Sequence, residues 1–437
     1  MDVQHKSLEA IDREHGWHPF TQMKDWAQDP MLIIEKGEGV WLFDQQGNRY
    51  IDGVSSLWVT VHGHRHPAID QAVKKQLDKI AHSTYLGLAH PAGIELTEKL
   101  IQIAPKGLTR VFYSDSGSEG VEIALKMAYQ YWQQRDVPKP NKKIFIRYAN
   151  DYHGDTIGAM SVGGIDLFFE KFHDLFFKTI TVNDESECMR LIEQQHEQIA
   201  GIVVEPLVQA AAGMLLHPEQ FLTRLREATR KYDILLIVDE VATGFGRTGK
   251  MFACDHEAVC PDLMVVGKGL TGGYLPIAAT LATDAVYQAF CGEYHEAKAF
   301  FHGHTYTANP LGCAAAIANL EVFEQEQTLQ QLQPKIEALT QELVDFKKLA
   351  HVQSVRQRGF MVGIELVKDK AKHIPYAFEE KMGYRVCQHI RKKGVILRPL
   401  GSVIILMPPL SIDSATLKQL TRATYEAIEE VTEQGAQ

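Results

Sequence analysis

The sequence lacks several features that mark particular classes of protein. Its six cysteines include no Cys-x-x-Cys pair, which argues against a zinc ribbon or a redox motif, and we expect reduced thiols. No stretch approaches the roughly 20 consecutive apolar residues of a membrane-spanning helix. No run of lysine and arginine is present, so binding to nucleic acid or to an anionic membrane is not expected.

The overall composition is typical of a globular enzyme. The 437 residues are 45% hydrophobic and 23% charged, and 45 Lys and Arg against 55 Asp and Glu give a net charge of −10. The first twenty residues contain no apolar segment like that of a signal peptide. We therefore expect a cytoplasmic protein, and at about 100–200 residues per domain its length corresponds to two or three domains.

Continuous apolar runs predict strands that are buried on both faces of a parallel sheet. These runs are 108–115, 142–148, 199–206, 234–240 and 263–268. Segments with helical periodicity lie between them, and in 121–132 the apolar residues follow the spacing of a one-faced helix. This alternation predicts an α/β fold with a mostly parallel sheet, whose site lies beyond the carboxyl ends of the strands.

The two ends of the chain have a different pattern of apolar and polar residues from the middle. A polar helical stretch at 322–349 leads to strand-like segments at 358–367 and 394–410, which predict a smaller α+β domain. Residues 39–53 predict a hairpin with its turn at Gln46-Gly47. The expected division is an N-terminal segment 1–60 that joins the small lobe, a large domain 61–325 and a small domain 326–437.

Two of the predicted strands end in an acid and a lysine, which would place both side chains at the same edge of the sheet. Residues 234–240 end in Asp239 and Glu240, and residues 263–268 end in Lys268. A buried salt bridge would explain this pair, since a buried acid needs a cationic partner. A second interpretation is a lysine that forms a Schiff base with pyridoxal phosphate (PLP), with the acid on the ring nitrogen.

Other segments could bind the phosphate and the ring of such a cofactor. In 114–119 a strand ends, Gly117 and Ser118 form a turn and a helix begins, which suits a phosphate but also an ordinary helix cap. Tyr152 follows the strand at 142–148 and could stack on a flat ring. Gly303 and Thr305 in FHGHTYTANP (301–310) could form a second phosphate clamp.

Two tempting motifs fail in their context. The glycines of GFGRTG (244–249) match a dinucleotide-binding pattern, but no amphipathic helix follows them. His62, His64 and His66 alternate, yet Pro67 indicates a loop and no acid or cysteine completes a set of ligands. We expect no metal site.

Taken together, five segments resemble the class III (omega) aminotransferases, which are PLP enzymes of fold type I. The segments are SDSGSEGVEIALKMA, YHGDTIGAMSV, VDEVATGFGRTGKMFA, GKGLTGGYLP and FHGHTYTANPLGCAAA. Four more are similar to the members of the class that transfer an amino group to 8-amino-7-oxononanoate in biotin synthesis. They are WHPFTQM (17–23), GVSSLWVTVHGHRHP (53–67), IAHSTYLG (80–87) and RPLGSVIILMPPL (398–410).

The resemblance implies a role for individual residues. Lys268 would carry PLP, Asp239 would bind its ring nitrogen, and Tyr152 would stack on the ring opposite Val241. The phosphate would be held by Gly117 and Ser118 of one subunit and by His304 and Thr305 of the other, which implies a homodimer. The substrate pocket would comprise Phe20, Leu57, Trp58, Tyr152, Asp155, Gly303 and Arg398, with Arg398 on the substrate carboxylate.

The sequence departs from the family pattern at three places. Members that use S-adenosylmethionine often have tyrosine at the position of Phe20 and two tryptophans at Leu57-Trp58, so the amino donor is open between S-adenosylmethionine and lysine. Asp151 replaces a more usual glycine before Tyr152. One alternative is an omega-aminotransferase for a diamine or an omega-amino acid. A non-catalytic protein with this fold is another, which the presence of all the key side chains disfavours.

Overall fold

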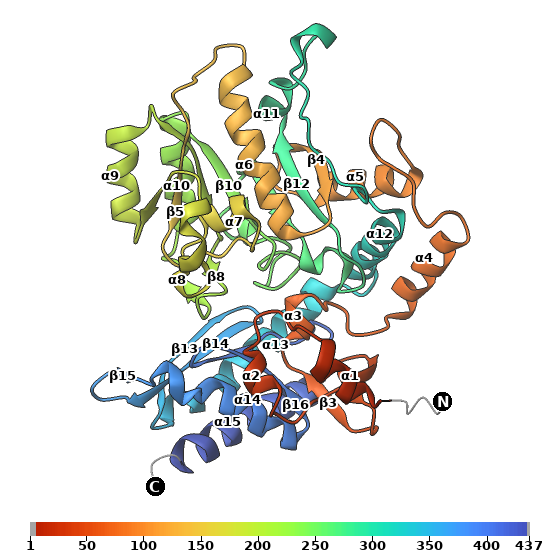
Figure 1. Cartoon of the computed structure of the whole chain (residues 1–437), viewed down its shortest axis with the longest axis vertical. Helices are drawn as coiled ribbons and strands as arrows, with labels where there is room; N and C mark the ends of the chain where they lie inside the picture. The colour runs from red at the N-terminus through yellow and green to blue at the C-terminus, as the bar shows by residue number, and fades with distance from the viewer. Residues whose placement is uncertain (1–5, 435–437) are drawn as a thin grey trace.

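The computed structural model describes residues 6–434, so the outermost ends of the two expected terminal segments, 1–5 and 435–437, lie outside the described part. Its centre is a seven-stranded sheet in the upper half of Figure 1. The strand order is β4 (Leu108–Ser114), β12 (Ala278–Thr283), β11 (Leu263–Val266), β10 (Leu235–Asp239), β7 (Ile199–Val204), β5 (Ile144–Tyr148) and β6 (Thr179–Val182). All five predicted strands are present, and the α/β fold class is confirmed.

The strands are parallel except for β12, which runs antiparallel to both β11 and β4. Both faces of the sheet are covered, because alternate residues of each strand enter different clusters of buried side chains. Ile237 and Val265 pack in the cluster that contains α6, whereas Leu236 and Val238 belong to the large cluster on the other face. Burial on both faces is the reason why these strands are continuously apolar.

Helices enclose this sheet. The long helix α6 (Gly117–Gln134) crosses it and buries Val121, Ala124, Leu125 and Ala128, as its spacing predicts. The other helices of the upper part are α4 (Pro67–Leu77), α5 (Pro91–Ile103), α7 (Ile157–Val162), α8 (Asp166–Phe169), α9 (Glu185–Gln195), α10 (Phe221–Lys231), α11 (Asp284–Gln288) and α12 (Pro310–Gln325). A short hairpin, β8 (Val208–Gln209) with β9 (Leu215–Leu216), completes this part.

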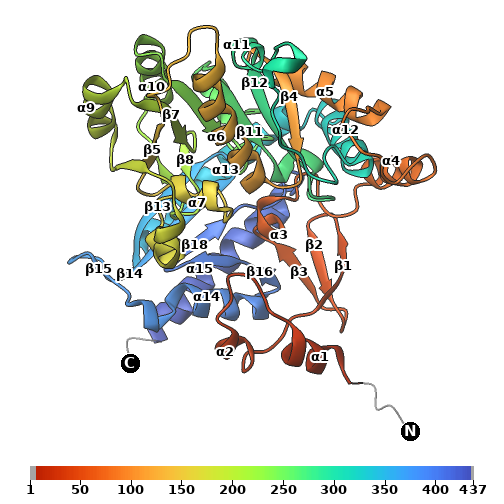
Figure 2. The same ribbon diagram turned by 45° about the horizontal axis from the view of Figure 1, so that its top comes forward.

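The lower part combines the two ends of the chain, coloured red and blue in Figures 1 and 2. One sheet has the order β1 (Ile34–Glu38), β2 (Trp41–Asp44), β3 (Arg49–Asp52) and β16 (Val395–Ile396). The other contains β13 (Val352–Arg358), β14 (Met361–Asp369), β18 (Val403–Leu406) and β17 (Arg398–Leu400), with β15 (Ile374–Pro375) beside β14. The helices are α1 (Leu8–His15), α2 (Met23–Trp26), α3 (Ser55–Trp58), α13 (Thr328–Leu343), α14 (Met382–Ile390) and α15 (Ser414–Gln434).

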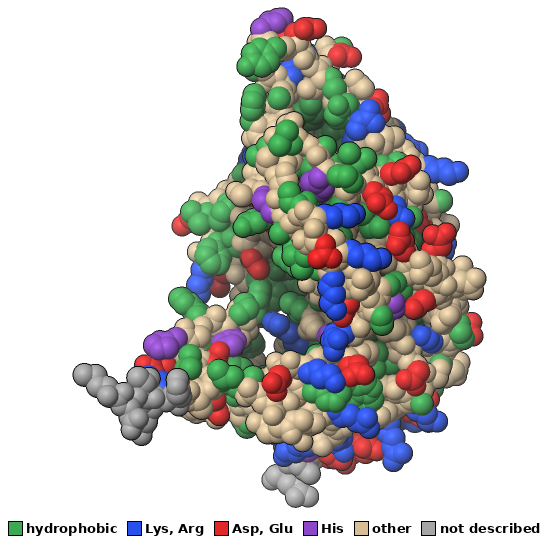
Figure 3. Space-filling model, turned by 90° about the vertical axis from the view of Figure 1, so that its right-hand side faces the viewer, with side chains coloured by type: hydrophobic (Ala, Val, Ile, Leu, Met, Phe, Trp, Pro, Cys, Tyr) green, Lys and Arg blue, Asp and Glu red, His purple; other side chains and the backbone are tan. Residues whose placement is uncertain are grey.

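The helical stretch expected at 322–349 is present but divided between two helices. Helix α12 ends at Gln325 and α13 begins at Thr328, because Gln327 takes a left-handed conformation (φ 49°) that an α-helix cannot contain. All six cysteines are free, and Cys291 is exposed rather than in the core. Among residues 6–434 no helix is both long and apolar enough to cross a membrane. The face drawn in Figure 3 is hollowed between the upper and lower parts.

Candidate active site

A cavity of about 520 Å³ opens at the carboxyl ends of the central strands. The turns after β4, β5, β7, β10 and β11 all contribute to it, as the fold class predicts for a parallel sheet. Its lining residues are Trp58, Ser116, Gly117, Ser118, Tyr152, His153, Gly154, Asp155, Thr156, Glu205, Asp239, Val241, Ala242 and Lys268. Eight of the residues predicted from the sequence therefore face one cavity.

Lys268 and Asp239 reach the cavity from neighbouring strands. Asp239 is the last residue of β10 and pairs in register with Val265 of β11, three residues before the lysine. Lys268 has a left-handed backbone (φ 38°), and its Nζ lies 5.3 Å from the ring centroid of Trp58. Burial lowers the pKa of Lys268, while the charges of Asp239, Glu205 and Asp155 oppose this shift. The site thus favours an uncharged amine more than water does.

Sequence reasoning missed the histidine that supports Asp239. The Asp239 carboxylate accepts hydrogen bonds from the backbone N–H of Val241 (3.0 Å) and from Nδ1 of His153 (2.8 Å). His153 is buried with 3% exposure, and Asp151 lies on its other side with Oδ2 at 3.6 Å from Nε2. The only signal in the sequence was the position of His153 next to Tyr152.

The start of α6 provides a cradle for an anion. Ser116 caps the helix and Glu119 completes a capping box, so the N–H groups of Gly117 and Ser118 head the first turn. Gly117 has to be glycine at this place, because a Cβ would lie 2.6 Å from a methyl carbon of Val241. Free N–H groups at the positive end of an 18-residue helix fit a phosphate group.

The Ser118 hydroxyl is held by a second turn that was not predicted. Its Oγ accepts a hydrogen bond from the N–H of Thr156 (2.9 Å) and donates one to the Thr156 hydroxyl (3.1 Å). Gly154 allows this approach, because its φ is +119° and a Cβ there would lie 2.3 Å from the Ser118 Oγ. The two loops therefore fix one hydroxyl beside the helix start.

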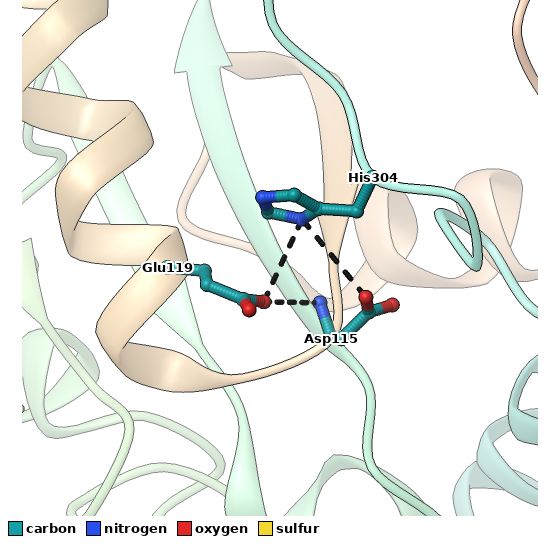
Figure 4. Close-up of side chains that lie close together, drawn as sticks. All are labelled: Asp115, Glu119 and His304. Atoms are coloured by element: carbon teal, nitrogen blue, oxygen red, sulfur yellow. Dashed lines mark hydrogen bonds and ion pairs between the residues drawn. The ribbon is translucent and has the colours of Figure 1, made fainter. Parts of the chain in front are cut away.

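His304 approaches the same turn of its own chain, as Figure 4 shows. Its Nδ1 lies 3.6 Å from the Glu119 carboxylate and 4.0 Å from that of Asp115. These three side chains could surround a cation, but the Glu119 Oε2 already accepts N–H groups from Asp115 and Ser116 as part of the helix cap. Thr305, the next residue, is exposed. Neither His304 nor Thr305 lines the cavity of its own chain.

Phe20, Phe168 and Arg398, here called the rim, lie next to Tyr152 of the cavity lining or to one another. The ring of Phe20 packs edge-on against Phe168, and Phe168 packs edge-on against Tyr152, at centroid distances of 5.3 and 6.1 Å. The guanidinium of Arg398 lies over the Phe20 ring at 5.9 Å. Burial lowers the pKa of Arg398, but it stays a cation because a guanidinium does not lose its proton near neutral pH. Phe168 joins the two halves of this rim and was not predicted.

Comparison with known proteins identifies the family. The model of the aminotransferase class-III family matches residues 22–428. The chain belongs to the class III aminotransferases. Proteins named adenosylmethionine-8-amino-7-oxononanoate aminotransferase are 52% identical in Aquifex aeolicus, over 98% of both chains, and 51% identical in Anoxybacillus flavithermus, over 95% of both chains.

Solved structures of aminotransferases share the fold. A crystal structure of adenosylmethionine-8-amino-7-oxononanoate aminotransferase from Methanocaldococcus jannaschii has a TM-score of 0.95 and 49% identity, and covers 97% of this chain and 98% of that one. A transaminase from the marine bacterium Virgibacillus has a TM-score of 0.91 and 33% identity, over 98% and 100% of the two chains. The predicted family membership and the aminotransferase activity are thereby confirmed.

A buried arginine of this aminotransferase holds the segment that carries Trp58. Ser56 and Trp58 have left-handed backbones (φ 60° and 66°), which costs roughly 1–3 kcal/mol each. Arg247 donates hydrogen bonds to the carbonyls of Thr60 (2.9 Å) and Pro408 (2.8 Å). Burial lowers its pKa to about 10, so it remains charged at neutral pH. The GFGRTG motif, rejected as a dinucleotide site, thus joins the two parts of the aminotransferase.

The remaining predicted residues lie outside the cavity. Phe20 and Arg398 come from the lower part of the aminotransferase and stand at the rim. Leu57 is 44% exposed beside Trp58. Gly303 lies against Leu86, whose Cδ2 would be 2.9 Å from a Cβ at that position.

Proposed function

We propose that the chain uses PLP to transfer an amino group to 8-amino-7-oxononanoate, forming 7,8-diaminononanoate as in biotin biosynthesis. The observation that best supports aminotransferase chemistry is that Lys268, Asp239 and the residues at the start of α6 line one cavity. The substrate assignment rests on the relatives that bear this name at 51–52% identity over nearly the whole chain. Arg398 at the rim adds a cation suited to the carboxylate of a keto acid.

The residues around the cavity fit PLP. The N–H groups of Gly117 and Ser118 would hold its phosphate, and Asp239 would bind its ring nitrogen. Tyr152 and Val241, which both line the cavity, would enclose the ring. When bound, PLP supplies an electron-withdrawing ring that stabilises negative charge on the carbon bearing the amine.

Side chains of the protein would transfer the proton and orient the substrate. Lys268 would attach PLP and, when released as an uncharged amine, would take a proton from the amine-bearing carbon of the donor and return it in the second half-reaction. Its buried surroundings favour the uncharged form. Asp239 would keep a proton on the ring nitrogen, because an adjacent carboxylate favours the positive form. Arg398 would orient the keto acid through a two-point contact with its carboxylate.

The names of the relatives favour S-adenosylmethionine over lysine as the amino donor. Phe20 cannot donate the hydrogen bond of the tyrosine that is common at its position, but its ring still supports Phe168 and Arg398. Donor and keto acid would use the same cavity in turn, which gives ping-pong kinetics.

We further propose a homodimer in which each subunit contributes Thr305 to the phosphate of the other. Exposed apolar side chains gather on the segments around this residue: Leu86, Leu88, Phe301 and Tyr306 are 56–79% exposed. The two segments are adjacent, since Gly303 lies against Leu86 and Tyr306 against His82. Such a surface is typical of one covered by a partner, and a second copy would cover it.

The substrate is tested by product analysis. Purified protein with PLP is given 8-amino-7-oxononanoate and either S-adenosylmethionine or lysine, and 7,8-diaminononanoate is measured by mass spectrometry. We expect product with S-adenosylmethionine. No product with either donor, but turnover of a diamine or an omega-amino acid, would overturn the biotin assignment and favour the activity of the more distant transaminases.

The shared phosphate site is tested by mixing two variants that are each impaired at limiting PLP. Lys268→Ala lacks the essential amine and Thr305→Ala lacks the contact to the partner, so each alone should be impaired at limiting PLP. A mixed dimer has one intact site, and random mixing should restore about a quarter of the wild-type sites. Absence of any recovery, with mixed dimers shown by mass spectrometry, would refute the shared site.

A further inference from the structure

Asp151 is a buried carboxylate that the roles described so far leave unexplained. Its exposure is 0%, and it precedes Tyr152 where the family resemblance leads us to expect glycine. A buried charge is costly unless it is paired, so its partners indicate what it does.

Two N–H groups bind the carboxylate of Asp151. The Gln209 side chain donates to Oδ1 at 2.7 Å, and the backbone N–H of Glu205 donates to Oδ2 at 3.3 Å. Since both oxygens act as acceptors, these contacts favour the ionised carboxylate. The same Oδ2 lies 3.6 Å from Nε2 of His153, a distance suited to an ion pair rather than to a hydrogen bond.

The imidazole of His153 thus lies between two carboxylates. Its Nδ1 is 2.8 Å from Asp239 Oδ2, and its buried Nε2 has no hydrogen-bond acceptor among residues 6–434. If the ring were neutral with its proton on Nδ1, the lone pair of Nε2 would point at the negative charge of Asp151. A doubly protonated ring presents an N–H to each carboxylate and removes this repulsion.

We propose that Asp151 is a positioning residue that keeps His153 doubly protonated, so that the imidazolium orients the Asp239 carboxylate in the cavity. Together, Asp151, His153 and Asp239 then carry a net charge of about −1. A protonated nitrogen of the PLP ring would balance this charge. The balance with the PLP ring rests on the proposed function, whereas the charge state of His153 does not.

The other titratable groups near the histidine are consistent with this charge state. Burial alone would lower the pKa of His153, but Asp151 and Asp239 raise it to about 10. Burial and the charge of Asp151 raise the pKa of Glu205 to about 8. Burial lowers the pKa of Lys268 and of His217, which lies near Asp151. Of these three basic groups, His153 alone has a raised pKa.

The charge on His153 is measured directly by NMR. Full-length protein labelled with ¹⁵N-histidine, with and without PLP, is titrated from pH 6 to 10, and the His153 signals are assigned with a His153→Gln variant. We expect both ring nitrogens to be protonated at pH 7–8 in the parent. In Asp151→Asn, the ring should lose its second proton at a pH about 1–3 units lower.

Two further variants control for structural effects. Asp44→Asn removes another buried carboxylate, in the N-terminal hairpin, and should leave the titration of His153 unchanged. Asp151→Gly gives a second test if Asp151→Asn unfolds at a lower temperature. An unprotonated Nε2 at pH 7 in the parent, or an unchanged titration in both Asp151 variants, would overturn the proposal. Failure to convert 8-amino-7-oxononanoate would instead overturn the proposed function and leave this result intact.

Discussion

Replacing Gly117 with alanine should weaken PLP binding through a steric clash. The added Cβ would lie 2.6 and 2.8 Å from the two methyl carbons of Val241, whereas carbon atoms in contact are about 3.5–4.0 Å apart. Relieving an overlap of about 1 Å requires a shift of Val241 or of the start of α6, at a cost of roughly 1–3 kcal/mol. Both groups line the cavity, so either movement distorts the phosphate cradle.

The expected loss of affinity follows from the hydrogen bonds at stake. A hydrogen bond to a charged group contributes about 1.5–3 kcal/mol, so losing one should weaken PLP binding by roughly 10- to 100-fold. PLP affinity is measured by titrating the apoprotein and following absorbance, and stability is measured by thermal unfolding. We expect both to decrease in Gly117→Ala.

Gly312→Ala is the matched control. A Cβ at Gly312 in α12 would lie 3.5 Å from Ile277, an ordinary contact, and alanine is favoured over glycine inside a helix by about 1 kcal/mol. This variant should keep its PLP affinity and be at least as stable as the parent. If Gly117→Ala bound PLP as tightly as Gly312→Ala and unfolded at the same temperature, the close packing at the cradle would not matter and the reasoning would be refuted.

Three other substitutions test separate parts of the site. Asp239→Asn should stay folded but lose about 100-fold or more in kcat, and an unchanged rate would contradict its role at the ring nitrogen. Arg398→Ala should lower kcat/KM for the keto acid by roughly 10- to 100-fold, whereas Arg422→Ala, at an arginine exposed on α15, should not. Burial raises the pKa of Glu240 from 4.5 to about 7, so the native state holds this proton longer than the unfolded chain and stability falls as pH rises through that interval. Glu240→Gln should remove roughly 2–3 kcal/mol of the fall between pH 5 and pH 8, measured by urea unfolding at these two pH values. An equal change of unfolding free energy in the two proteins would exclude the effect.

Local patterns predicted most of the large sheet. The five predicted strands are continuously apolar because both of their faces are buried, and this signal does not depend on knowing their neighbours. β12 and β6 were not predicted, because their residues, AATLAT and TITV, lack a long apolar run. The turn at Gln327 was not predicted either, because a polar helix and a break inside it have similar amino-acid compositions.

The family, the fold class and the shared position of Asp239 and Lys268 could all be predicted from the amino-acid sequence. That position follows from the fold, because the carboxyl ends of parallel strands meet at one edge. Which side chains support these two residues depends on the packing of distant segments. His153 reaches Asp239 across 86 residues and Arg247 reaches Thr60 across 187, and such contacts depend on how the loops and the two parts of the molecule pack. Short-range patterns carry no information on these distances, which is why Asp151 was an unexplained departure in the sequence, whereas in the fold it lies beside His153.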